Sequence, residues 1–175
     1  MDIFIIKISD AENIKPELLE EFRHKSFANK KKQTEHCLSY LMTDKILKGV
    51  YRIEKRDLEF VNGKPYLKTR EKFFSISNSG EYIVLAFSDG ECGVDIEEMK
   101  ERDFVSISKR MKFNSETSED FYSEWTTYEA EYKLGSKYKS KKQMKTENYM
   151  ITAVSENIQE TFEIYILNGA AFSNP

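Results

Sequence analysis

The hydrophobic pattern near the N-terminus predicts a strand followed by two helices. Met1–Ile8 is too short and alternates too strongly for a signal peptide, which favours a strand. A helix is predicted over Pro16–Phe22, where proline and acidic residues form the first turn. A second helix is predicted from about Gln33 to Val50. Its apolar residues recur on one helical face and are expected in the core: Leu38, Leu41, Met42, Ile46 and Val50.

The middle of the chain alternates short apolar runs with turns, a pattern that predicts strands. The predicted strands are Leu58–Val61, Tyr66–Lys68, Phe73–Ser77, Tyr82–Phe87 and Cys92–Glu97. Between the first two, Asn62-Gly63-Lys64-Pro65 predicts a turn, in which Asn62-Gly63 supplies the positive φ that a tight turn needs. Residues 78–81 predict a second turn. Ser88–Glu91 predicts a hairpin that joins the last two strands.

The last third of the chain predicts two helices and two strands. A short helix is expected over Phe104–Phe113 and a longer one over Ser118–Leu134, capped by Ser118 or Thr117 and ended by Gly135. The closing strands are expected at Tyr149–Val154 and Thr161–Leu167, with a loose tail after Asn168. Strands and helices thus form two comparable sets, before and after the predicted hairpin. This order allows an internal duplication, although no sequence repeat proves one.

Composition narrows the possible classes of protein. Of 175 residues, 39% are hydrophobic and 13% aromatic, which excludes a disordered chain. The net charge of -3 gives no general attraction to nucleic acid, and no apolar run approaches the length of a membrane span. Cys37 and Cys92 have no metal-binding spacing and are expected to be reduced and buried. We therefore expect a cytoplasmic monomer that binds neither nucleic acid nor membrane.

Three carboxylates are the strongest candidates for chemistry. Asp95 and Glu97 are two apart on one predicted strand, so they share a face. Glu129 lies between Trp125 and Lys133 at helical spacing, so these three residues form one stripe. Convergent carboxylates suit magnesium, which often completes its coordination with phosphate oxygens. The alternative is that these acids are merely solvated, because a third of the chain is charged.

Four sequence blocks point to a family. They are Gly63-Lys64-Pro65, Phe74–Tyr82, Gly93–Glu97 and Trp125–Lys133. In order and spacing these blocks resemble the signatures of the 4′-phosphopantetheinyl transferases, and in particular their larger, single-chain branch. The resemblance implies an α+β fold in which two similar α/β halves form a pseudodimer, each with a small, mainly antiparallel sheet packed against helices. The halves would be residues 1–88, with elements that bind coenzyme A, and residues 89–175, with the metal-binding and catalytic carboxylates.

The resemblance also implies a reaction and its partners. Such enzymes move the phosphopantetheine arm of coenzyme A, their substrate, onto a serine of an acyl or peptidyl carrier protein. By position, Asp95, Glu97 and Glu129 would hold Mg²⁺ against the pyrophosphate. Glu129 is also the candidate general base for the serine hydroxyl, and Lys133 is expected to pair with a phosphate. Gly63, Lys64 and Pro65 would lie beside the adenine, and a turn formed by Ser77, Asn78 and Ser79 beside the phosphates.

The chain departs from the family pattern at three positions. Asn78 replaces a histidine that helps to hold the phosphate, and Tyr128 replaces a lysine. Ser39 stands at about the position of an arginine that meets the 3′-phosphate of coenzyme A, so Lys30, Lys31 or Lys32 is the candidate substitute. A solvated basic turn is the alternative for those lysines. The departures support a second hypothesis, an inactive homologue that binds coenzyme A or a carrier protein as a scaffold or regulator.

Two further features have ordinary explanations. His24 and His36 have no matching partners in the sequence and are expected to be surface or edge residues. A lysine-rich segment follows the second long helix and is expected to be an exposed loop; its basic residues are Lys137, Lys139, Lys141, Lys142 and Lys145. Binding of nucleic acid is one alternative for this segment, and contact with an acidic helix of a carrier protein is another.

Overall fold

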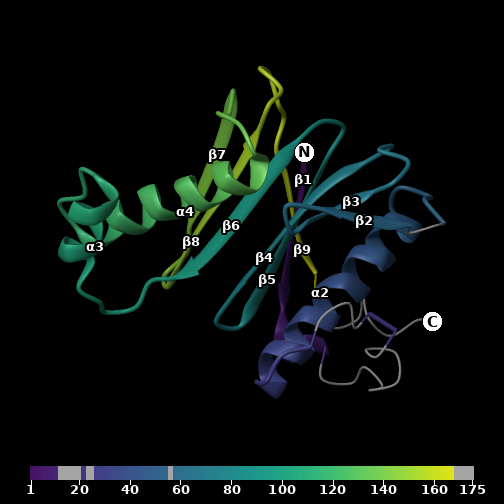
Figure 1. The fold of residues 1–175 in the computed structure, drawn as a ribbon, viewed down its shortest axis with the longest axis horizontal. Coiled ribbons are helices and arrows are strands. Elements are labelled where there is room, and N and C mark those ends of the chain that lie inside the picture. Colours follow the sequence, from purple (N-terminus) through teal and green to yellow (C-terminus); the bar gives the residue numbers. More distant parts are fainter. Residues whose placement is uncertain (12–20, 23–25, 55–56, 168–175) are drawn as a thin grey trace.

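The described strands form three small, mostly antiparallel sheets, and helices pack against them in an α+β arrangement (Figure 1). The computed structural model describes residues 1–11, 21–22, 26–54 and 57–167. Most of the helix predicted at Pro16–Phe22, His24 and the tail after Leu167 lie outside these residues. No helix of the described part is long and apolar enough to cross a bilayer.

The first sheet has the strand order β4-β5-β1-β9. Its strands are β1 (Asp2–Lys7), β4 (Phe73–Ser79), β5 (Tyr82–Ser88) and β9 (Glu163–Leu167). β1 pairs antiparallel with β5 and parallel with β9. The C-terminal strand therefore completes the sheet that begins at the N-terminus. A short 3₁₀ helix, Ile8–Ala11, follows β1.

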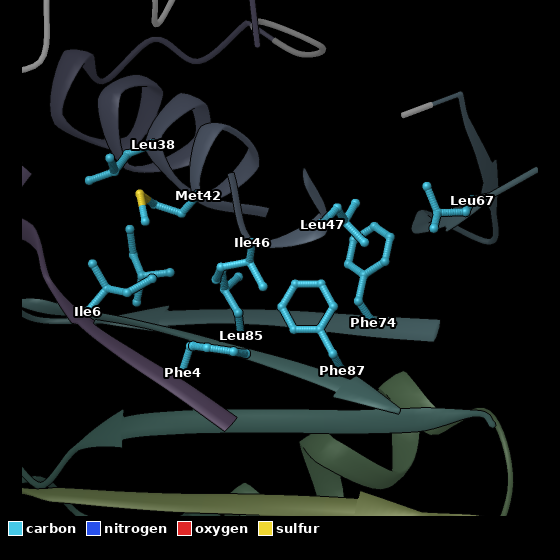
Figure 2. Close-up of a cluster of buried hydrophobic side chains, with 11 residues drawn as sticks. Phe4, Ile6, Leu38, Met42, Ile46, Leu47, Leu67, Phe74, Leu85 and Phe87 are labelled. Carbon is cyan, nitrogen blue, oxygen red and sulfur yellow. The ribbon is translucent and has the colours of Figure 1, made fainter. Parts of the chain in front are cut away.

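Helix α2 (Lys30–Gly49) packs on this sheet and forms its main core (Figure 2). The helix begins at Asn29, whose side chain accepts hydrogen bonds from two backbone N–H groups of the first turn and so caps it. The buried residues that meet between helix and sheet are Phe4, Ile6, Leu38, Met42, Ile46, Leu47, Leu67, Phe74, Ile83, Leu85 and Phe87. The expected burial of Val50 is wrong, because α2 ends at Gly49 and Val50 is 54% exposed.

The second sheet has the order β6-β8-β7 and carries the candidate acids. Its strands are β6 (Cys92–Glu98), β7 (Ser140–Lys145) and β8 (Tyr149–Ser155). The predicted β5–β6 hairpin is wrong, because β6 pairs with β8 and belongs to a different sheet from β5. The expected lysine-rich loop is wrong in part, because residues 140–145 form the edge strand β7.

Helix α4 (Ser118–Leu134) lies along the second sheet (Figure 1), and a shorter helix, α3 (Phe104–Met111), precedes it. Thr117 and Asp120 form a capping box at its start, and Gly135, with φ +83°, ends it, as predicted. The helix approaches β6 so closely that a Cβ atom at Gly93 would lie 2.0 Å from the carbonyl oxygen of Ala130. Glycine at this position therefore sets the distance between α4 and the acids on β6.

Serine side chains join the two sheets where β4 runs beside β6. Backbone N–H groups on alternate residues of β6 donate hydrogen bonds to serine hydroxyls on alternate residues of β4. The pairs are Val94 N to Ser75 Oγ (3.0 Å), Ile96 N to Ser77 Oγ (3.4 Å) and Glu98 N to Ser79 Oγ (3.0 Å). In a continuous sheet, these N–H groups of β6 would donate to backbone carbonyls of the neighbouring strand. Here the serine hydroxyls of β4 accept their hydrogen bonds instead. This serine ladder, Ser75, Ser77 and Ser79, fixes β6 against the first sheet.

A two-stranded hairpin, β2 (Leu58–Val61) and β3 (Lys64–Leu67), forms a small sheet of its own, and its Leu67 packs into the main core. Its turn residues Asn62 and Gly63 have positive φ angles of 51° and 83°, as the sequence predicted. Lys64 and Pro65, which were expected in the turn, already belong to β3. The side chains of Lys64 and Pro65 therefore project from strand β3 and not from the turn.

Candidate functional site

Asp95 is a buried carboxylate in the middle of β6 and is only 5% exposed. Its Oδ1 atom accepts hydrogen bonds from Ser77 Oγ and from Lys133 Nζ, both at 2.8 Å. Its Oδ2 atom is buried and has no hydrogen-bond partner among the described residues. Because an unpaired buried oxygen of a charged group is costly, this atom is suited to accept from, or coordinate, something that the chain does not supply.

Glu97 lies two residues further along β6, on the same face as Asp95. Its Oε2 accepts from Ser79 Oγ at 3.2 Å and its Oε1 from Trp125 Nε1 at 3.3 Å. Burial, followed by the charge of Asp95, raises the pKa of Glu97 above its ordinary value. The predicted alternation is confirmed, because Val94 and Ile96 are buried in the hydrophobic core between the sheets.

Glu129 is half-buried on the stripe of α4 that faces β6. Trp125 and Lys133, one turn to either side, both donate hydrogen bonds to acids on β6, which confirms the predicted stripe. Burial, and then the charge of Asp95, raises the pKa of Glu129, while Lys133 lowers it. The third acid is therefore close enough to the other two to feel their charge. We call Asp95, Glu97 and Glu129 the β6–α4 acids.

The ammonium of Lys133 is fully engaged within the protein. It donates to Asp95 Oδ1 at 2.8 Å, to Ser77 Oγ at 2.9 Å and to the carbonyl oxygen of Val94 at 3.0 Å. An ammonium has three hydrogens, so these acceptors use all of its donors. A contact with a phosphate, as the sequence predicted, would require at least one of these bonds to be exchanged.

The β6–α4 acids are of the ligand type that a hard cation prefers, but their side chains are not arranged around a common point as ligands of a bound ion would be. Within the described residues, no group of three or more His, Cys, Asp or Glu side chains is arranged to hold a metal ion. Lys133 supplies the positive charge at Asp95 instead. The unpartnered Oδ2 of Asp95 and the raised pKa values of Glu97 and Glu129 are nevertheless features that a hard cation would relieve.

A cleft of ≈ 1220 Å³ opens between α2, the β2–β3 hairpin and the C-terminal end of α4. The β6–α4 acids do not line it, whereas Lys133, which binds Asp95, does. Most residues that were predicted to contact coenzyme A line it, although they come from separate elements: Gly63, Lys64, Pro65, Asn78 and Lys133. Ser39, Lys32 and Tyr128, which the sequence singled out as departures or substitutes, line it too. Lys133 is therefore shared between the cleft and the acid cluster.

Ser77 and Ser79 have a different role from the one predicted. They lie on strand β4 rather than in a turn, so side chains alternate between its two faces. The two serines point to β6, where they bond Asp95 and Glu97, while Asn78 faces the cleft. Of the predicted three residues, only Asn78 is in a position to meet a ligand in the cleft.

Both signs of charge are present in the cleft. Lys64 donates to Glu91 Oε2 at 2.8 Å and to the carbonyl oxygen of Cys92 at 2.9 Å. Lys137 pairs with Glu131 at 2.8 Å.

Both cysteines are free and buried, as predicted, and burial raises the pKa of Cys92 to about 12, which leaves it unreactive.

Three features around the acids and the cleft were not predicted from the sequence. The serine ladder was signalled only by serines at alternate positions on β4. Glu35 lines the cleft and accepts a hydrogen bond from Asn78, yet nothing in its sequence context distinguishes it from other helical acids. His36, which was expected to be an ordinary surface or edge residue, lines the cleft and packs against the rings of Phe27 and Tyr40.

Comparison of the chain with protein-family models gave no match. Comparison with curated proteins also gave no match. The resemblance to the 4′-phosphopantetheinyl transferases therefore stays a prediction, which depends on the four sequence blocks and on the arrangement of the residues within them.

Proposed function

We propose that this chain is a magnesium-dependent 4′-phosphopantetheinyl transferase that acts on an acyl or peptidyl carrier protein. One observation carries the proposal: Lys133 lines the large cleft and at the same time binds Asp95 of the buried acid cluster. A nucleotide that fills the cleft would therefore have its phosphates next to the β6–α4 acids. The volume of ≈ 1220 Å³ is ample for a ligand as large as coenzyme A.

The residues of the cleft have distinct roles in this proposal. The adenine would lie against Gly63, Lys64 and Pro65, because the β2–β3 hairpin places these residues along one wall of the cleft. Lys133 would exchange one of its internal hydrogen bonds for a pyrophosphate oxygen. Because that ammonium already holds Asp95, the same contact would fix the pyrophosphate relative to the acids.

The transfer step needs a base and a stable leaving group. Glu129 would take the proton of the carrier serine as its oxygen attacks the β-phosphorus of coenzyme A. The bond from that phosphorus to the bridging oxygen breaks, and adenosine 3′,5′-bisphosphate leaves with the electron pair. The raised pKa of Glu129 suits it to this role, because a base works best when its pKa approaches the working pH.

The donor set indicates where Mg²⁺ would bind. Asp95, through its unpartnered Oδ2, would hold the ion together with Glu97 and Glu129. The bound ion would neutralise charge that develops on the leaving phosphate. Trp125 and Ser79 orient Glu97 by their hydrogen bonds, and Ser77 orients Asp95, so the acids are held by rigid elements.

We also propose the pseudodimer that the resemblance implies, together with a cytoplasmic, monomeric state. Its support is that residues 1–88 supply a sheet covered by α2, while residues 89–175 supply a sheet covered by α4. The halves are not separate, because β9 comes from the second and pairs with β1 of the first. The basic edge strand β7, on which Lys141 and Lys142 are exposed, is a candidate contact for an acidic carrier protein.

The experiment is a transfer assay with the full chain. The protein, MgCl₂ and coenzyme A are incubated with candidate carrier proteins, and intact-mass spectrometry records the carrier. We expect the mass gain of one phosphopantetheine arm, and no gain when the acceptor serine of the carrier is replaced by alanine. A panel of carriers that stays unmodified, while a reference transferase modifies the same panel, would exclude the proposed activity.

A second candidate function is an inactive homologue that binds coenzyme A or a carrier protein as a scaffold or regulator. Two observations favour it: every donor of Lys133 is used internally, and Asn78, which faces the cleft, carries no charge and donates its hydrogen bond to Glu35. In that case coenzyme A would bind in a direct titration, but the carrier mass would not change. The two measurements together separate the candidates.

A further inference from the structure

Lys64 joins the β2–β3 hairpin to strand β6. Its ammonium donates a hydrogen bond to Glu91 Oε2 at 2.8 Å and another to the carbonyl oxygen of Cys92 at 2.9 Å. Cys92 is the first residue of β6, the strand that carries Asp95 three residues later. One wall of the cleft is therefore tied directly to the strand of the acids.

The surroundings of the Lys64–Glu91 pair strengthen this tie. The side chain of Lys64 is only 13% exposed and that of Glu91 27%, so solvent screens the pair less than it screens a pair on the open surface. Tyr66, two residues further along β3, donates to the same oxygen of Glu91 at 3.4 Å. The segment of Glu91 is itself fixed, because its backbone N–H donates at 2.9 Å to Glu156 Oε1, just after β8. The anchor of the hairpin thus belongs to the second sheet.

The contacts of the hairpin with α2 are of a different kind. Leu67 is buried in the main core, and the half-exposed ring of Phe60 lies 6.5 Å from the ring of Tyr40 on α2, measured between centroids. Two strands of four residues have little stability of their own. Loss of the polar contacts of Lys64 would therefore leave the hairpin attached on the α2 side and free to move relative to β6 and α4.

We infer that the Lys64–Glu91 pair is a latch that fixes the β2–β3 hairpin against β6, so that Lys64 is a positioning residue of the cleft. The hairpin and the end of α4 both line the cleft, so the latch sets the distance between these walls. Lys64 then acts on a ligand through the placement of the hairpin, while its ammonium stays bound to Glu91 and Cys92. The consequence for coenzyme A rests on the proposed function, whereas the latch itself does not.

The test of the latch is amide hydrogen exchange of the full chain without ligand, measured by mass spectrometry. In Lys64→Met and in Glu91→Ala, exchange over residues 58–67 should become about tenfold faster or more. The reason is that exchange follows the population of the open state, which rises when a hydrogen bond between charged groups is lost. Exchange in α4 and β8 should not change. The double variant should exchange no faster than the faster single variant, because both substitutions remove the same contact.

The matched control is Lys72→Met. Lys72 is covered to a similar extent, at 15% exposed, and pairs with Asp89 at 2.6 Å, but it lies outside both the hairpin and the lining of the cleft. Its replacement should leave exchange in the hairpin unchanged. A change as large as in Lys64→Met would show that the loss of any such ion pair loosens the hairpin, and would overturn the latch.

The transfer assay measures the consequence for coenzyme A. Both latch variants should raise the KM for coenzyme A by about tenfold and keep kcat within about twofold, because the serine ladder and β8 still hold the acids on β6. Weaker binding by Lys64→Met with tighter binding by Glu91→Ala would show that a released Lys64 contacts the ligand itself, and would overturn the positioning role.

The exchange data separate this inference from the proposed function. Unchanged exchange in the hairpin of either latch variant, or an equal rise in α4 and β8, would overturn the latch whatever the chain catalyses. A wild-type chain that modifies no carrier would exclude the proposed function alone, and a rise in exchange confined to the hairpin would still establish the latch.

Discussion

The carboxylate of Glu160 and the three carboxylates of the β6–α4 acids have opposite surroundings in this molecule. Glu160 is surrounded by donors from its own chain: the N-terminal ammonium at 2.6 Å, Ser155 and Asn157 at 2.8 Å, and Ser88 at 3.2 Å. Burial would raise the pKa of Glu160, but these hydrogen bonds, led by that of the ammonium, lower it to about 2. Its charge is satisfied by the fold, which is how a structural carboxylate is held.

The β6–α4 acids are not satisfied in this way. They are three carboxylates near one lysine, burial raises the pKa values of Glu97 and Glu129, and one oxygen of Asp95 has no partner in the described part of the chain. A cluster that the fold leaves short of positive charge gains more from an external cation or a transferred proton. The contrast therefore supports a structural role for Glu160 and a chemical role for the β6–α4 acids.

The largest expected effect is on transfer activity. Glu129→Gln should lower the rate of carrier modification by about 10²–10⁴-fold, because the amide cannot take a proton. Glu160→Gln should leave that rate nearly unchanged. The measurement is the initial rate of carrier modification by mass spectrometry, with thermal melting as the check of folding. Glu119→Gln, at an exposed acid on the same helix, is the matched control. A Glu129→Gln variant with wild-type turnover would rule out the assigned base.

The next effect is on stability, where substitution of Glu160 should matter more than substitution of one of the β6–α4 acids. Glu160→Gln should lower the free energy of unfolding by about 2 kcal/mol, since hydrogen bonds to a charged, buried group are lost. Glu97→Gln should change it by less than about 1 kcal/mol, because the substitution also removes repulsion from Asp95. Urea unfolding monitored by circular dichroism measures both, with the exposed Glu163 replaced by Gln as control. Equal losses in the two variants would contradict the contrast between Glu160 and the β6–α4 acids.

The smallest effect is the pH dependence of stability. Glu97 and Glu129 have raised pKa values, so between their ordinary 4.5 and those values the folded chain binds more protons than the unfolded one. Their contribution to stability therefore falls as pH rises through this window, by at most about 1.4 kcal/mol per group and pH unit. Glu160 acts in reverse: its contribution is complete above 4.5 and is lost as pH falls towards about 2.

Urea unfolding between pH 2 and pH 8 tests these signs. Glu97→Gln should reduce the fall in stability above pH 4.5, and Glu160→Gln should reduce the loss at acid pH. A Glu97→Gln variant that steepens the fall above pH 4.5 would show that the acid is stabilised, rather than strained, by its surroundings.

Cap residues and hydrophobic periodicity predicted most helices and strands, whereas pairing between strands distant in the sequence determined the remaining elements. Helix α4 was predicted to the residue because Thr117 and Gly135 are direct cap signals. Helix α2 begins three residues before the predicted Gln33, because the cap at Asn29 precedes three lysines with no apolar periodicity. Strand β7 has no alternating hydrophobicity either, and it is a strand because β8 supplies its hydrogen bonds. No local pattern contains that information.

The candidate site was predictable in part for the same reason. Strand alternation placed Asp95 and Glu97 on one face, and helical spacing placed Glu129 and Lys133 on one stripe. That Lys133 binds Asp95, instead of standing free for a phosphate, depends on how closely α4 approaches β6. Contacts between distant elements cannot be read from spacing within one element, and the position of Glu35 in the cleft is another case.

The most direct test of the central claim is a titration of the chain with MgCl₂ at neutral pH, observed through the carboxyl-carbon NMR signals of its acids. We expect saturable shifts of Asp95, Glu97 and Glu129, while the signal of Glu160 stays in place. Shifts of all surface acids alike, or no change at Asp95 and Glu129, would contradict the proposal that this cluster binds a divalent cation.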